Sequence, residues 1–141
     1  MKNKADLVKG WLAKAQSDLN AADILLDSAG PYDMVCYHAQ QAIEKLLKGF
    51  LAFLEAAIPR THDLEELQRL CLESKSVAEL TEIDLAQITD YVVLARYDFE
   101  FWPNQTTAAE ALNVAERVQT IIIKNLPEGY RQDDDSSSER V

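Results

Sequence analysis

The sequence has little of what breaks helices, crosslinks chains or spans membranes. Glycine and proline occur four times each in 141 residues, turn pairs such as Asn-Gly are absent, and no segment alternates with the period of two that predicts strands. Cys36 and Cys71 lie in helix-like segments without CxxC or Cys/His spacing, so we expect two buried free thiols. No apolar run nears the roughly 20 residues that cross a bilayer, so no association with a membrane is expected.

Basic residues are also outnumbered, since 14 lysines and arginines face 24 acids and give a net charge of −10. The segment 128–141 holds five acids and two arginines, so residues 1–127 carry −7. An acidic body excludes broad electrostatic coating of nucleic acid, because that affinity comes from neutralising phosphates. It leaves room for a local basic pocket. The charged start, 1–6, lacks the apolar stretch of a signal peptide, so we expect a cytoplasmic protein.

Apolar periodicity predicts an all-α fold, an antiparallel up-and-down bundle of four long helices plus one short helix. We expect one domain over 1–127. The short helix should begin near Thr61, and the long helices should span 5–29, 31–57, 77–95 and 106–125. The residues from 128 to 141 have almost nothing to bury, so they should form a disordered acidic tail.

Two apolar stripes mark the faces that the first two helices should bury. They consist of Leu7, Trp11, Ala15, Leu19, Ala22 and Leu26 in the first, and Val35, Ala39, Ala42, Leu46, Phe50 and Phe53 in the second. Gly30 and Pro31 form a stop signal between the helices, because glycine suits a left-handed cap and proline cannot continue a helix.

A polar strip follows the stripe of the second helix. It consists of His38, Gln41, Lys45 and Lys48, at spacings of three, four and three residues. One interpretation is a site for a phosphate or another anion. The other is a solvated helix flank, with Glu44 and Lys48 as an ordinary pair four residues apart.

His62 and Asp63 are adjacent candidates for an acid/base couple, since a carboxylate can orient an imidazole. Neighbouring residues at a helix start rarely face each other, however. Helix capping is the alternative role for Thr61 and Asp63. In that case His62 should form a hydrogen bond back to the bundle.

An arginine precedes an aromatic-rich loop in Arg96-Tyr97-Asp98-Phe99-Glu100-Phe101-Trp102-Pro103. Arg96 could bind a phosphate or carboxylate with two hydrogen bonds, and the aromatic side chains could stack on bases or form a protein interface. The alternative is a structural pair of Arg96 with Asp98 or Glu100, with the aromatic residues covering the end of the bundle. Phosphate-binding loops, GxGxxG and HExxH are absent from the sequence, so neither a cofactor nor a metal site is expected.

Three segments together resemble the prokaryotic HEPN family. They are Tyr37-His38-Ala39-Gln40-Gln41-Ala42-Ile43-Glu44-Lys45-Leu46-Leu47-Lys48, Thr61-His62-Asp63-Leu64 and Arg96-Tyr97, and the opening Trp11–Leu19 fits the same pattern. The resemblance covers about 7–125. It implies a bundle of four or five helices that forms a homodimer, often together with a minimal nucleotidyltransferase or as a toxin–antitoxin module. Many members are metal-independent ribonucleases with an arginine followed, after four to six residues, by a histidine at the dimer interface.

This chain departs from that ribonuclease motif. Arg96 matches the arginine, but Phe101, Trp102 and Pro103 stand where the histidine should follow, and none of them accepts a proton. The resemblance therefore favours a homodimeric binding protein that acts with a minimal nucleotidyltransferase and has a local site for a nucleotide or RNA. Its candidate residues are His38, Gln41, Lys45, Lys48, His62, Asp63, Arg96, Tyr97 and Asp98. The alternatives are a ribonuclease toxin that uses Arg96 with another base, His62 among the possibilities, and a structural dimerisation adaptor.

Overall fold

The structure is a computed structural model that describes residues 3–131, and it contains no strand in that range. The predicted all-α fold is confirmed. In chain order the elements are α1 (Lys4–Asp27), α2 (Tyr32–Phe53), α3 (Leu64–Ser74), α4 (Ala78–Thr81), the 3-10 turn η1 (Ile88–Asp90), α5 (Tyr91–Tyr97), α6 (Gln105–Lys124) and the 3-10 turn η2 (Glu128–Tyr130). None of the helices within 3–131 is both long and apolar enough to cross a membrane.

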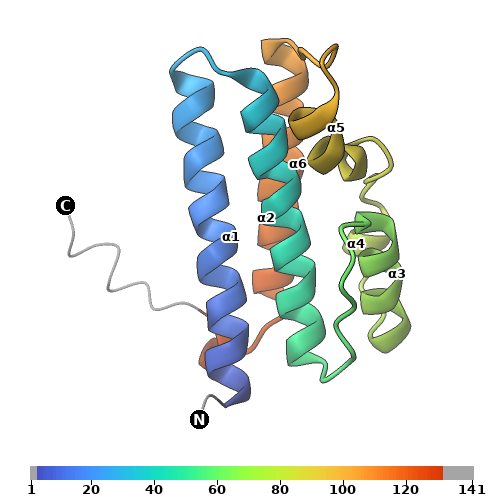
Figure 1. The fold of residues 1–141 in the computed structure, drawn as a ribbon. Coiled ribbons are helices and arrows are strands. Elements are labelled where there is room, and N and C mark those ends of the chain that lie inside the picture. The colour runs from blue at the N-terminus through green and yellow to red at the C-terminus, as the bar shows by residue number, and fades with distance from the viewer. Residues whose placement is uncertain (1–2, 132–141) are drawn as a thin grey trace, which may run out of the picture.

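The central helix is α2, which packs against α1 and against α6, the helix seen behind it in Figure 1. Helices α1 and α2 are antiparallel along their whole length, and α6 runs in the same direction as α2. Helix α3 covers the second half of α2, whereas η1 and α5 lie beside its first half. The apolar core fills the space between α1, α2 and α6 and continues under α3.

The stripe predicted for α2 is buried, with Phe53 partly exposed. In the stripe predicted for α1, Ala15, Leu19 and Ala22 are buried and Trp11 and Leu26 are partly buried, but Leu7 is not. The side chain of Leu7 is 45% exposed, and the fully covered positions are Val8, Leu12, Ala15, Leu19 and Ala22. The prediction that Leu7 lies on the buried face of α1 is therefore wrong. Spacings of four and three in alternation follow the helical period of 3.6 more closely than a series of fours does, so the stripe that begins at Val8 stays on one face.

The predicted stop after the first helix is confirmed. Ala29 and Gly30 have φ values of 64° and 105°, and the Gly30 N–H donates to the Leu25 carbonyl at 2.7 Å, which satisfies one of the last carbonyl groups of α1. A Cβ atom at position 30 would lie 2.9 Å from the backbone nitrogen of Tyr32. The turn from α1 into α2 therefore requires glycine at this position.

The continuous helix predicted over 77–95 is wrong. Helix α4 ends at Thr81, and an irregular segment leads to η1 and α5. Ile83 and Leu85 are both buried in this segment, although residues two apart would point to different sides of a helix. The Asp84 carboxylate accepts a hydrogen bond from the Ala86 N–H at 3.0 Å, a local bond that competes with helix formation.

A side chain of α3 satisfies the backbone at this break. Nε2 of Gln68 donates to the carbonyl groups of Leu80 at 2.7 Å and of Ile83 at 2.9 Å. These are carbonyl groups that a continuous helix would have paired internally. The break is thus held by a contact between segments that are distant in sequence.

The described chain continues past the predicted domain boundary at residue 127. Tyr130, in η2, lies edge-on against Phe53 with ring centroids 4.9 Å apart, and Nζ of Lys4 is 5.4 Å from the centre of the Tyr130 ring. The start of the predicted tail is therefore ordered, because Tyr130 has an aromatic ring to bury beside the first turn of α1. The rest of that tail, 132–141, lies outside the described residues.

Candidate functional site

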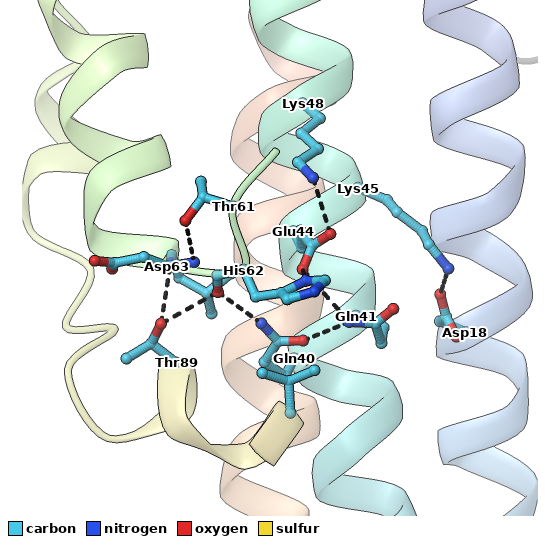
Figure 2. A network of polar contacts seen from close by, with 12 residues as sticks. Asp18, Gln40, Gln41, Glu44, Lys45, Lys48, Thr61, His62, Asp63 and Thr89 are labelled. Carbon is cyan, nitrogen blue, oxygen red and sulfur yellow. Dashed lines mark hydrogen bonds and ion pairs between the residues drawn. The ribbon is translucent and has the colours of Figure 1, made fainter. Parts of the chain in front are cut away.

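The polar strip predicted on α2 is divided between two buried carboxylates, one on each side of the helix (Figure 2). His38 and Lys45 form hydrogen bonds with the carboxylate of Asp18. Lys48 and Gln41 form hydrogen bonds with the carboxylate of Glu44. The predicted pair of Glu44 and Lys48, four residues apart, is confirmed. Lys48 is only 8% exposed, however, so the interpretation of the strip as a solvated helix flank is wrong.

Asp18 joins α1 to α2. Its Oδ1 lies 2.8 Å from Nδ1 of His38, and its Oδ2 lies 2.6 Å from Nζ of Lys45. Burial raises the pKa of the Asp18 carboxyl, but the hydrogen bonds and positive charges of His38 and Lys45 more than offset this, so the pKa lies below its ordinary value of 3.8. The pair of charge-assisted hydrogen bonds fixes the two helices against each other.

Glu44 joins α2 to the loop before α3. Its Oε2 accepts a hydrogen bond from Nζ of Lys48 at 3.0 Å, and its Oε1 accepts from Nδ1 of His62 at 2.7 Å and from Nε2 of Gln41 at 3.4 Å (Figure 2). Three donors thus compensate the burial of a carboxylate that is 6% exposed. Nζ of Lys48 also lies 5.9 Å from the centre of the Trp11 ring.

The backbone of His62 is fixed as firmly as its ring. Its carbonyl oxygen accepts hydrogen bonds from Nε2 of Gln40 at 3.0 Å and from Oγ1 of Thr89 at 3.4 Å. Thr89 Oγ1 in turn accepts a hydrogen bond from the N–H of Leu64 at 2.8 Å. The predicted hydrogen bonding of His62 back to the bundle is confirmed.

Asp63 is the N-cap of α3, with its carboxylate accepting hydrogen bonds from the N–H groups of Glu65 at 3.0 Å and Glu66 at 3.3 Å. The capping role predicted for Asp63 is thus confirmed, whereas Thr61, for which capping was also predicted, accepts a hydrogen bond from the N–H of Asp63 at 3.1 Å. The acid/base couple of His62 with Asp63 is therefore wrong. Glu44 is the carboxylate that meets the His62 ring, because capping turns the Asp63 side chain toward α3.

Arg96 lies in the last turn of α5. Its Nε donates to the carbonyl of Val92 at 2.8 Å, and its guanidinium carbon lies 5.1 Å and 5.8 Å from the ring centres of Tyr97 and Tyr37. Within 3–131 no ion pair joins Arg96 to Asp98 or Glu100. Asp98 instead accepts a hydrogen bond from the N–H of Glu100 at 2.9 Å, so that alternative for Arg96 is wrong.

The end of α5 and the loop after it expose three aromatic side chains. Tyr97 is 67% exposed, Phe99 89% and Trp102 74%. Trp102 is held in place by a hydrogen bond from its Nε1 to the Phe99 carbonyl at 2.9 Å. The prediction that the aromatic residues cover the end of the bundle is confirmed for Phe101, whose ring centroid lies 5.4 Å from that of Tyr91. The other three side chains face outward.

Asp18, Gln40 and Thr89 are not among the site residues predicted from the sequence. A signal existed for Asp18, because an acid three residues after Ala15 falls within the buried face of α1 and indicates a partner on the facing helix. No such local signal marked Gln40 and Thr89. Both bind the backbone of a residue more than twenty positions away.

The two cysteines are buried, as predicted. Burial raises the pKa of Cys36, which is also near Asp33, to about 12, and that of Cys71 to about 12. Both thiols therefore stay protonated and unreactive near neutral pH. The described part of the chain holds no group of three or more His, Cys, Asp and Glu residues that could bind a metal ion.

The fold and these contacts define a small helical-bundle domain with buried ion pairs on its central helix and an arginine among exposed aromatic residues at one end. The model of the HEPN domain family matches residues 8–126. The chain belongs to the HEPN domain family, which confirms the resemblance found in the sequence. No curated protein and no solved structure matched the chain.

Replacing Asp18 with asparagine should lower the free energy of unfolding at pH 6 by about 2 kcal/mol, because His38 and Lys45 lose a charged acceptor. The folded pKa lies below 3.8, so the contribution of Asp18 is complete above 3.8 and is lost as pH falls through the folded pKa. Urea unfolding between pH 6 and pH 2 should show the two proteins converging in stability at the acid end. A difference that stays constant down to pH 2 would contradict this role.

Proposed function

We propose that the chain is a non-catalytic, homodimeric HEPN protein that works with a minimal nucleotidyltransferase. It contributes a nucleotide- or RNA-binding site or acts as one part of a toxin–antitoxin-type module. The observation that carries the proposal is the isolated Arg96. The family's arginine is on the surface, where it binds the Val92 carbonyl and two tyrosine rings, and no histidine follows it at 101–103.

The missing histidine weakens proton transfer but does not weaken anion binding. Cleavage of RNA through its 2′-hydroxyl needs a group that takes the hydroxyl proton, and the side chains of Phe101, Trp102 and Pro103 cannot do so. A guanidinium retains its charge at every physiological pH and matches the oxygen atoms of a phosphate. Arg96 is thus suited to hold a phosphate without cleaving its ester.

The aromatic face, defined here as Val93, Tyr97, Phe99 and Trp102, supports the homodimer. Val93 is 53% exposed and extends the three exposed aromatic residues along α5. Exposed apolar patches of this kind mark interaction surfaces, and Tyr, Phe, Trp and Arg are enriched in interfaces. A second copy that docks face to face about a two-fold axis buries this patch against itself.

Two alternatives predict different results. A ribonuclease toxin would cleave RNA with Arg96 and a base outside the family's motif. A pure dimerisation adaptor would form the same dimer without binding either a nucleotide or a nucleotidyltransferase.

The double substitution Phe99→Ser with Trp102→Ser should weaken the dimer at least about a hundredfold, since two large apolar side chains leave the interface. Sedimentation or light scattering at graded concentrations measures this. The matched control is Ile24→Ser, which removes an apolar side chain that is 65% exposed on α1 rather than on α5 or its loop. A monomeric parent protein, or a double variant that still dimerises equally well, would contradict the proposed interface.

Affinity purification of the protein from its own cells should recover a nucleotidyltransferase, identified by mass spectrometry of the eluate. Nucleotides released from the same eluate are identified in parallel. Recovery of the homodimer alone, from cells shown to contain such a nucleotidyltransferase, would overturn the partnership and favour the adaptor.

Purified protein should leave single-stranded RNA intact in EDTA, even at high protein concentration, because the residues that follow Arg96 do not accept a proton. Gel analysis of labelled RNA measures the result, with Arg96→Ala as the comparison. Cleavage that disappears in Arg96→Ala would establish the ribonuclease alternative instead.

A further inference from the structure

The exposed side of α5 has a positive charge near one end and a negative charge at the other. Arg96, in the last turn of the helix, is exposed and takes part in no ion pair within residues 3–131. Asp90, which directly precedes the helix, is exposed as well and is likewise in none of those ion pairs. Six residues separate Asp90 from Arg96, which corresponds to about 9 Å of helix. Two opposite charges on one short surface thus lack a charged partner in the described part of the chain.

Val93 lies midway between these two charges. It is three residues after Asp90 and three residues before Arg96, so it neighbours both of them on the surface of the helix. Val93 is 53% exposed and belongs to the aromatic face, as does Tyr97 four residues later. The two charges therefore flank the apolar surface that is proposed as the dimer interface.

The negative end of this surface is also hollow. A cavity of about 400 Å³ lies between the start of α3 and α5, and its lining residues include the three carboxylates of Asp63, Glu65 and Asp90. Val92 and Val93 line it as well. Carboxylates beside apolar side chains suit an arginine, because its alkyl stem packs on apolar surface while its guanidinium binds a carboxylate. Val93 belongs both to this cavity and to the aromatic face, so the two surfaces are continuous.

A two-fold axis determines how these charges can meet in a dimer. If the axis crosses α5 at Val93, the two α5 helices are antiparallel, and each residue before Val93 lies opposite the residue equally far after it in the second copy. Asp90 of each copy then faces Arg96 of the other. If the two helices were parallel instead, Arg96 would meet Arg96 and Asp90 would meet Asp90, and like charges would repel. The charges therefore favour the antiparallel arrangement.

We propose that two copies of the chain dock with antiparallel α5 helices, and that Arg96 of each copy enters the acidic cavity of the other and binds the carboxylate of Asp90. Nε of Arg96 keeps its hydrogen bond to the Val92 carbonyl of its own chain, and the terminal amino groups of the guanidinium are left to bind the carboxylate. This inference rests on the proposed homodimer and adds its orientation and its charged contacts. A phosphate on Arg96 competes with Asp90 of the second copy for the same guanidinium.

Reversal of the two charges in separate chains tests the proposal. Arg96→Glu and Asp90→Arg should each weaken the dimer at least about a hundredfold, because each substitution places like charges opposite each other twice. An equimolar mixture of the two variants should form a one-to-one heterodimer with an affinity close to that of the parent dimer, since both of its pairs join opposite charges. Sedimentation at graded concentrations measures the affinities, and native mass spectrometry identifies the heterodimer by its mass.

Two comparisons separate this pairing from general effects of charge and folding. Arg117→Glu makes the same change at another exposed arginine, on α6, and should leave dimerisation unchanged. Asp90→Arg reduces the net negative charge of the chain, so general repulsion between two acidic chains predicts a tighter dimer, whereas the proposed pairing predicts a weaker one. Formation of the heterodimer also shows that both variants are folded.

Three results would overturn the antiparallel pairing. They are a dimer of Asp90→Arg as tight as that of the parent protein, weakened variants whose mixture stays monomeric, and a loss in Arg117→Glu equal to that in Arg96→Glu. If the double substitution of Phe99 and Trp102 separates the dimer while charge reversal does not, the aromatic interface stands and only its orientation is wrong. A parent protein that is monomeric at every concentration overturns the homodimer itself, so the two failures are distinguishable.

Discussion

Asp18 and Glu44 are carboxylates held almost out of water on the two sides of α2, each with a lysine and a histidine within hydrogen-bond distance. A buried charge that loses its partner is strongly destabilising, so the partners must keep their places once the bundle has formed. The Asp18 cluster sets the register of α1 against α2. The Glu44 cluster places the loop before α3, and with it the His62 ring. The geometry of the candidate site therefore follows from ion pairs in the bundle.

The parts of the fold that depend on local sequence could be predicted. The periodicity of α2, the stop at Gly30 and the all-α class follow from side chains within a few turns of each other. The helix over 77–95 could not be judged in this way, because its break depends on Gln68 of α3 and on the burial of both Ile83 and Leu85. The same limit applies to the site. In the sequence His62 is adjacent to Asp63, but in the folded chain its ring forms a hydrogen bond with Glu44, which is 18 positions away.

Helix α5 and the loop after it carry both features on which the proposed function depends. The aromatic face places Phe99 and Trp102 at the end of the bundle. The guanidinium of Arg96 lies beside this face, over the rings of Tyr97 and Tyr37. Because Tyr97 belongs to the aromatic face and also contacts Arg96, a second copy on that face would approach the arginine. An anion on Arg96 is then expected to alter the affinity for the second copy, and by the same factor in both directions.

The contact of Tyr130 with Phe53 and Lys4 brings the last described residues beside the first turn of α1. Both ends of the described chain thus emerge at the end of the bundle opposite α5 and its loop (Figure 1). The ends of the described chain, residues 3 and 131, therefore lie a full helix length, about 30 Å, from the aromatic face. A fluorescent protein, an immobilisation tag or a tethered second domain joins the described chain at the end of the bundle that is opposite the aromatic face. For a protein proposed to dimerise through its aromatic face, the point of attachment of a tag is thus separate from the proposed interface.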